Sequence, residues 1–388
     1  MTVWEDLVGQ SEVVDRLQRA VVAADEALNG EPAAGMTHAW LFTGPPGSGR
    51  SNAARAFATA LLCDRGGCGE CLSCRTALVG SHADVTMVVT DQSVIRVDVV
   101  RETVRLAALA PAGSRWQIMI VEDADRLNER AADALLKSIE EPPPRTVWLL
   151  CAPTVEDVAP TIRSRCRSLV LRTPSTAEVA EHLMRRSEVS EGVAVFAARA
   201  SQGHIGRARA LALDEAARNR RREVLRVPGQ LNDLGSCMAA AANLADAATE
   251  DATSRSSPLD ARETTDLDLA YGAGTSGVKL TGYAAARKEL VHNQKQRGRR
   301  LVRDSIDRFL LDLASFYRDV LAVQLGSRSE LINEELRSEI ASMARGTTGE
   351  RTTQRLDAIF AAREALEGEV APVLALESLM ISLRGATQ

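Results

Sequence analysis

The sequence has no long apolar run and almost no lysine. None of its apolar stretches approaches the roughly 20 residues that a membrane-spanning helix needs, so we expect no membrane segment. The first ten residues, MTVWEDLVGQ, contain no basic segment followed by an apolar run, which predicts no signal peptide and a cytoplasmic protein. Lysine supplies only four of the 47 basic residues, and arginine supplies the rest. An arginine at any single basic position is therefore weak evidence of function.

The bulk composition is that of a soluble globular protein. A chain of 388 residues is too long for one ordinary core, which predicts two or three domains. The apolar fraction of 45% and the charged fraction of 26% are typical of such proteins. The net charge of −5 argues against nucleic acid wrapped over the whole surface, although it permits a local basic patch.

Five short apolar runs in the first part of the chain predict buried parallel strands. They are residues 38–44, 83–89, 115–123, 146–152 and 168–173. Helical stretches such as 51–62 and 129–140 alternate with them. This alternation predicts a wound α/β domain with a mostly parallel sheet.

After residue 173 the strand signal disappears and helical patterns follow. Ser175 is the expected cap of the first of these helices. Residues 249–283 are polar and rich in Gly, Ser and Thr, which predicts a mobile insert. Apolar residues at three- and four-residue spacings predict an amphipathic helix over 302–321, and a final helix is expected over 372–383.

Residues 44–51, GPPGSGRS, lie between a predicted strand and a predicted helix. The pattern G-x-x-x-x-G-K-[S/T] cradles phosphates with backbone amides at a helix N-terminus. The chain matches it with an arginine at the lysine position: Gly44, Gly47, Gly49, Arg50 and Ser51. A forked guanidinium fits the site of a compact ammonium poorly. Two interpretations stay open, a nucleotide-binding loop and a preserved turn that only shapes the fold.

An acidic pair, Glu122-Asp123, follows the third predicted strand. In P-loop ATPases such a pair holds Mg²⁺ and polarises the attacking water. The common order is Asp-Glu, and the reversed order moves both carboxylates by about one methylene. Positioning errors of about 1 Å can cost about 10²-fold in rate. We therefore predict a weak or absent ATPase.

Four cysteines lie within a dozen residues that also contain three glycines: Cys63, Cys68, Cys71 and Cys74. A closed, structural Zn²⁺ site with four thiolates satisfies all of them and folds a segment that lacks its own core. Disulfides are the alternative, which a reducing cytoplasm disfavours. The other cysteines, Cys151, Cys166 and Cys237, are expected to be small core residues.

The chain resembles the subunits of the bacterial DNA polymerase III clamp loader, within the AAA+ ATPases. The resemblance rests on residues 4–17, 38–51, 121–144 and 152–166, together with the cysteine segment. It is strong over 1–173, moderate over 174–215 and only architectural beyond. It implies a P-loop AAA+ domain over 1–173 with a zinc module at 63–74, a small helical lid over 174–215, and an all-α collar over 216–388.

The family includes ATP-hydrolysing motor subunits of the gamma/tau type and delta-prime subunits, which often lose the ATPase residues. Arg50 and Glu122-Asp123 favour the delta-prime type, as does the chain length. The lid arginine that senses nucleotide in active subunits would fall at Gly206, with Arg207 one residue late. The motor type is the alternative.

The resemblance also implies a role for Arg165, within the sequence Thr-Ile-Arg-Ser-Arg-Cys at 161–166. In the family this arginine is a finger that reaches the γ-phosphate held by a neighbouring subunit, and such fingers are worth about 10³–10⁵ in rate. An exposed arginine that only precedes a strand is the other interpretation.

The implied partners are the motor (gamma/tau) and delta subunits of a five-membered ring, the sliding clamp, and primer–template DNA. A basic cluster near residues 287–303 could contact DNA phosphates, or it could be a solvated helix face. Its members are Arg287, Lys288, Lys295, Arg297, Arg299, Arg300 and Arg303.

Overall fold

The computed structural model describes residues 2–31, 35–90, 94–272, 282–368 and 370–384 of the chain. It divides into two compact units, Met1–Leu213 and Asp214–Gln388. The first unit contains both the predicted AAA+ domain and the predicted lid. The second consists of the helices predicted to form the collar.

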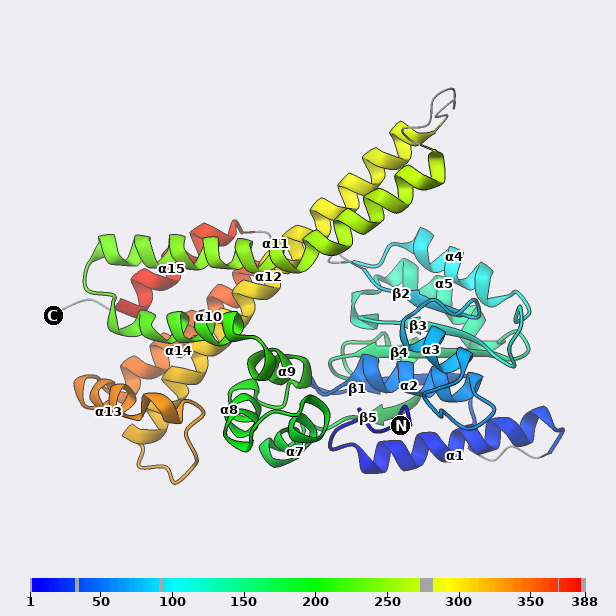
Figure 1. Ribbon diagram of the computed structural model, residues 1–388, viewed down its shortest axis with the longest axis horizontal. Helices are drawn as coiled ribbons and strands as arrows, with labels where there is room; N and C mark the ends of the chain where they lie inside the picture. Colours follow the sequence, from blue (N-terminus) through cyan, green and yellow to red (C-terminus); the bar gives the residue numbers. More distant parts are fainter. Residues whose placement is uncertain (1, 32–34, 91–93, 273–281, 369, 385–388) are drawn as a thin grey trace. The chain divides into compact units, whose positions relative to one another are not determined.

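The first unit is built on a parallel sheet of five strands (Figure 1). The strands are β1 (Ala39–Thr43), β2 (Val85–Val88), β3 (Gln117–Val121), β4 (Thr146–Ala152) and β5 (Arg167–Val170). Their order across the sheet is β2-β3-β4-β1-β5, and every pair is parallel. All five predicted strands are confirmed, and the fold class is α/β with a parallel sheet, followed by a helical part of the chain.

Two hydrophobic clusters cover the two faces of this sheet. Because successive side chains of a strand point to opposite faces, Trp40 and Phe42 join one cluster while Leu41 joins the other. The first cluster contains residues of α1 and α2, and the second contains residues of α4 and α5. Figure 1 shows these helices on opposite sides of the strands. The result is a three-layer domain whose sheet is buried on both faces.

The helices of the first unit agree with the sequence pattern. They are α1 (Ser11–Leu28), α2 (Arg50–Leu62), α3 (Leu72–Leu78), α4 (Val97–Ala107), α5 (Glu129–Glu140), α6 (Pro160–Arg163), α7 (Thr176–Ser187), α8 (Glu191–Ser201) and α9 (Ile205–Leu213), with a 3₁₀ turn η1 (Ala124–Arg126). Ser175 caps α7 as predicted, in a capping box with Glu178. Helices α7 to α9 follow the sheet and correspond to the predicted lid.

Within its described residues, the second unit contains helices and no strand, and it has its own core. Its helices are α10 (Glu215–Arg226), α11 (Leu234–Tyr271), α12 (Tyr283–Gln324), α13 (Arg337–Gly346), α14 (Gly349–Glu367) and α15 (Pro372–Arg384), with 3₁₀ turns η2 (Val227–Gly229) and η3 (Glu334–Leu336). Residues Ile306, Phe309, Leu310, Leu313 and Val320 of α12 lie in this core, which confirms the predicted amphipathic pattern. Within the described residues, no helix has the length and apolarity needed to span a bilayer.

The predicted mobile insert at 249–283 is wrong over most of its length. Residues 249–271 continue α11, and residue 283 begins α12. The two helices are held together by polar contacts that an apolar period cannot reveal. For example, Arg297 of α12 donates to Asp260 and Glu263 of α11. Residues 273–281 of the predicted insert lie outside the described residues.

Candidate functional site

The glycine-rich loop joins β1 to α2, and its backbone requires glycine at two close approaches. Gly44 has φ 155°, and a Cβ there would lie 2.6 Å from the carbonyl oxygen of Leu171. Gly47 has φ 85°, and a Cβ there would lie 2.6 Å from the side chain of His204. Gly49, with φ 91°, precedes the first residue of α2. The loop therefore depends on glycine where it packs against Leu171, after β5, and against His204, before α9.

The side chain of Arg50 is hydrogen-bonded to the backbone of the loop. Arg50 is the first residue of α2, with Ser51 next to it, and its Nη1 donates to the carbonyl oxygen of Gly44 at 2.8 Å. In a phosphate loop with lysine, the ammonium reaches the terminal phosphates instead. This bond uses one of the five N–H donors of the guanidinium and holds the side chain against the loop backbone.

The acidic pair at the end of β3 is also engaged. Glu122 accepts a bond from Nη2 of Arg55, on α2, at 2.8 Å. Asp123 has φ 52°, a left-handed conformation, and lies 3.9 Å from Nε of Arg126. Arg55 was not identified from the sequence, where nothing marks which carboxylate it meets. A Mg²⁺ ion at Glu122 would have to displace this guanidinium or share the carboxylate with it.

A cavity of about 480 Å³ opens beside α2 within the first unit. Its walls include Arg55, Arg186, His182 and Arg209. Arg186 pairs with Asp6 at 2.6 Å, and burial lowers the pKa of His182. Gly206, the position expected for the sensing arginine, also lines the cavity. Arg209, about one helical turn after Gly206 in α9, places a cation on the wall of the cavity. The volume suits a small ligand.

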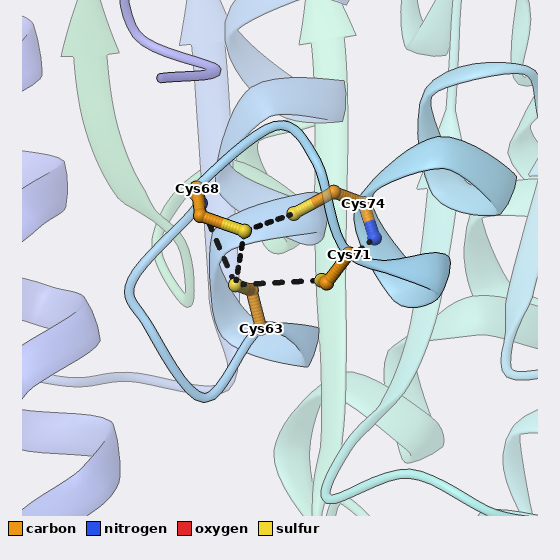
Figure 2. A group of neighbouring side chains, drawn as sticks. All are labelled: Cys63, Cys68, Cys71 and Cys74. Atoms are coloured by element: carbon orange, nitrogen blue, oxygen red, sulfur yellow. Dashed lines mark hydrogen bonds between the residues drawn. The ribbon is translucent and has the colours of Figure 1, made fainter. Parts of the chain in front are cut away.

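The four predicted cysteines converge on one point (Figure 2). Cys63 directly follows α2, Cys74 lies in α3, and the other two come from the loop between these helices. All four sulfur atoms lie within 4.8 Å of one another. The Sγ atom of Cys63 lies 3.7 Å from that of Cys68 and 3.7 Å from that of Cys71, and the Sγ atoms of Cys68 and Cys74 are 3.9 Å apart.

These separations fit a metal better than a disulfide. Thiolates bonded at about 2.3 Å to a tetrahedral Zn²⁺ are about 3.8 Å apart, whereas bonded sulfurs are about 2.0 Å apart. All the cysteines of the chain are free thiols in the structure. The four-thiol donor set and its spacing therefore match a closed zinc site.

Backbone amides favour the thiolate at Cys63 and Cys68, whereas burial raises the pKa of Cys74. The amides of Glu70 and Cys71 lower the pKa of Cys68 to about 6. Burial raises the pKa of Cys63, but the amides of Cys68, Arg65 and Gly67 outweigh it and the net shift is downward. The cluster also anchors the start of the chain, because Trp4 Nε1 donates to the carbonyl of Gly66 at 3.2 Å. Of the remaining cysteines, Cys151 and Cys237 are buried as expected, whereas Cys166 is half-buried.

Arg165 lies apart from the loop, in the turn between α6 and β5. Its Nη1 donates to the carbonyl of Thr161 at 2.8 Å and to the Ser164 hydroxyl at 3.1 Å, and its Nη2 pairs with Glu140 at the end of α5. The side chain remains 38% exposed. The guanidinium is thus at the surface and tethered, and the role of Glu140 was not predicted from the sequence.

Comparisons with known proteins point to one family. Residues 26–175 match the family described as DNA polymerase III, delta subunit. The chain is 39% identical over 155 residues to DNA polymerase III subunit delta' of Pseudomonas aeruginosa, covering 38% of this chain and 47% of that protein. It is 34% identical over 195 residues to subunit gamma/tau of Mycobacterium tuberculosis, covering 49% of this chain and 32% of that protein. The aligned part spans less than half the length of these relatives.

Solved structures give weaker likenesses. A gamma subunit-related protein of DNA polymerase III from Thermotoga maritima is 14% identical, with a TM-score of 0.43 over 89% of this chain and 93% of that chain. The ORC1 protein of Aeropyrum pernix is 16% identical, with a TM-score of 0.40 over 75% of this chain and 87% of that chain. The sequence matches include both delta-prime and gamma/tau proteins and do not separate the two types. Over residues 26–175, the chain is similar in sequence to the DNA polymerase III clamp-loader family.

Proposed function

We propose that this chain is a delta-prime-type subunit of a cytoplasmic clamp loader. The subunit itself does not hydrolyse ATP. It joins motor and delta subunits in a five-membered ring and presents Arg165 to ATP bound by a neighbour. The ring then loads the sliding clamp at primer–template DNA. The observation that carries this proposal is that two residues at the ATPase positions are bonded within the chain. Arg50 donates to the carbonyl of Gly44, and Glu122 accepts from Arg55.

These internal bonds oppose nucleotide chemistry in two ways. Hydrogen bonds to charged groups contribute about 1.5–3 kcal/mol when they are well shielded. Both pairs are partly exposed and are worth less, yet a nucleotide must still replace them with contacts of its own. In addition, the carboxylate paired with Arg55 is less available to hold Mg²⁺ or to orient water. The loop keeps its fold-shaping role without these functions.

A titration of the isolated chain with Mg·ATP tests the absence of motor activity. The wild-type chain should bind weakly and show no turnover. Arg50→Lys should strengthen binding, and the triple variant R50K/E122D/D123E, which restores the family order, should strengthen it further. Tight binding with turnover by the wild-type chain would support the gamma/tau motor type, which is the second candidate because the cavity beside α2 is lined by cations.

The finger proposal is tested in the assembled complex. Arg165→Ala should leave ring assembly intact while the neighbour's ATP hydrolysis falls by about 10³–10⁵-fold at that interface, because a finger stabilises transition-state charge. Arg163→Ala, two residues away on the same turn, is the matched control and should keep the wild-type rate. Single-turnover hydrolysis with assembly checked by gel filtration gives the measurement. An unchanged rate in R165A removes Arg165 from the mechanism.

We also propose that Cys63, Cys68, Cys71 and Cys74 hold one structural Zn²⁺ ion. The sulfur spacing and the amides around the cluster support this. All four ligands come from the protein, which leaves no open position for catalysis. Metal analysis of protein purified without chelator should find about one zinc per chain. C68S/C71S should lose it, whereas the core variant C237S should retain it.

A further inference from the structure

The distal parts of α11 and α12 carry opposite charge. We call residues 246–272 and 283–304 the helical arm. The α11 part contains seven carboxylates and two arginines, and the α12 part contains seven cations and two carboxylates. The two parts run side by side beyond the other helices of the second unit (Figure 1).

Only some of these cations are used between the two helices. Arg297 donates to Asp260 and Glu263 of α11, with Nη1 at 2.9 Å from Glu263. Gln294 donates to the carbonyl of Asp260 at 3.0 Å, and Tyr283 donates to Asp268 at 2.5 Å. These residues mark the face of α12 that is directed toward α11.

A second set of cations lies on the opposite face of α12. We call Lys288, Lys295, Arg299 and Arg303 the basic stripe. At 100° per residue they fall within an arc of about 80°, centred about 160° from Arg297. At 1.5 Å per residue the stripe is about 22 Å long. His292 falls in the same arc, and no carboxylate does.

The basic stripe is available to a partner. All four side chains are exposed. Within the part of the chain that the structure describes, none of the four takes part in an ion pair, in contrast to Arg297 and Arg300 on the same helix. Four like charges along one line repel one another, and a polyanion would relieve that repulsion.

The chemistry of the arc favours a phosphate backbone over a protein. Protein interfaces rely on buried aromatic and apolar anchors, and this arc contains none. Binding to single-stranded nucleic acid relies on aromatic stacking, for which the arc also has no side chain. A duplex offers one charge per about 1.7 Å of its axis and is straight over the length of the stripe. We propose that the basic stripe binds the phosphate backbone of duplex DNA, without sequence preference.

This inference does not depend on the delta-prime assignment, because binding is measured on the full chain alone. Fluorescence anisotropy with a labelled 20-base-pair duplex would be recorded between about 50 and 200 mM salt, a range over which phosphate contacts weaken strongly. The stripe variant is K288Q/K295Q/R299Q/R303Q. Each phosphate contact contributes about −0.9 to the slope of log K against log salt. The stripe variant should therefore lose up to about 3.6 of that slope and bind at least about tenfold more weakly at the lowest salt.

The matched control removes the same charge elsewhere in the second unit. R226Q/R328Q/R345Q/R351Q changes four exposed arginines away from the arm and should bind as wild type does. Circular dichroism should show wild-type helicity for both variants, because glutamine is a good helix former. Equal losses of duplex affinity in the two variants would show that net charge alone explains the binding, and this would overturn the proposal. So would no measurable duplex binding by the wild-type chain, or equally tight binding to a single strand.

Discussion

At the scale of single residues, the first unit satisfies its charged groups internally wherever the sequence suggested chemistry. Arg50, Glu122 and Arg165 each have a partner within the first unit. Residue identity predicted which groups are present, whereas the partner of each depends on contacts between elements far apart in sequence. Arg55 and Glu122, for example, are separated by 67 positions. For this reason the sequence predicted the candidate site residues but not how they are used.

The pairing of Arg165 with Glu140 leads to a prediction about release of the finger. Both side chains are more than a third exposed, so the pair is worth at most about 1 kcal/mol. Glu140→Gln should therefore change the ATPase rate of the assembled complex by less than about fivefold, in contrast to the large loss in R165A. A loss in E140Q comparable to that in R165A would mean that Glu140 positions the finger during catalysis, which single-turnover rates would reveal.

Asp84 gives a pH-dependent prediction. It is 1% exposed and accepts bonds from the amides of Ala112, at 2.5 Å, and Ser114, at 3.0 Å. Burial opposes ionisation, but these bonds outweigh it and lower the pKa of Asp84 in the folded protein. The ionised group therefore contributes stability that is present above about pH 4, the unfolded pKa, and is lost as pH falls through the lower folded pKa.

Asp84→Asn should reduce the free energy of unfolding by about 1–3 kcal/mol at pH 7, because the amide cannot replace a charged acceptor. The difference from wild type should shrink as the pH falls below about 4, because the carboxyl of the unfolded wild-type chain then becomes protonated and the unfolded state is stabilised. Urea titrations at pH 7 and pH 3.5 would measure it. A difference that stays constant over this range would contradict the role given to the charge.

At the scale of elements, prediction succeeded where burial imposes a period. The five strands are apolar runs because both faces of the sheet are covered, and α5 was predicted with its bounds because its ends carry clear signals, such as Asn128 accepting from the amide of Ala131. The insert at 249–283 failed for a physical reason. The distal half of α11 has Pro258 on an exposed side and meets α12 through polar groups, so it shows no apolar stripe. Its partners lie more than 30 positions away.

The polar pairing within the helical arm predicts local stability. Arg297→Ala removes the contacts to Asp260 and Glu263, whereas Arg299→Ala, two residues away, removes an exposed side chain on the opposite face. Loss of the Arg297 contacts should lower the free energy of local opening of the helical arm by about 1–2 kcal/mol. Amide hydrogen exchange over residues 255–300 should then be about 5- to 30-fold faster in R297A and unchanged in R299A. Equal exchange in the two variants would show that this pairing does not stabilise the arm.

At the scale of the whole molecule, the two units have separate hydrophobic cores and different reporters. All four tryptophans, Trp4, Trp40, Trp116 and Trp148, lie in the first unit. The second unit consists of helices and contains no tryptophan. Tryptophan fluorescence therefore follows the first unit alone, while helical ellipticity follows both.

This division allows removal of the proposed metal to be localised. A closed zinc site contributes its binding energy to folding, and the cysteine cluster is anchored to Trp4 through Gly66 and packs into the core of the first unit. A chelator should therefore lower the thermal midpoint seen by tryptophan emission by several degrees, because a loss of a few kcal/mol shifts the midpoint of a domain of this size by that much. The ellipticity should keep a component from the second unit at its original midpoint. C68S/C71S should reproduce the shift without chelator and respond to chelator no further. Two results would contradict a zinc site that stabilises the first unit. One is an unchanged tryptophan midpoint when chelator is added to the wild-type chain. The other is a further fall of the tryptophan and ellipticity midpoints when chelator is added to C68S/C71S.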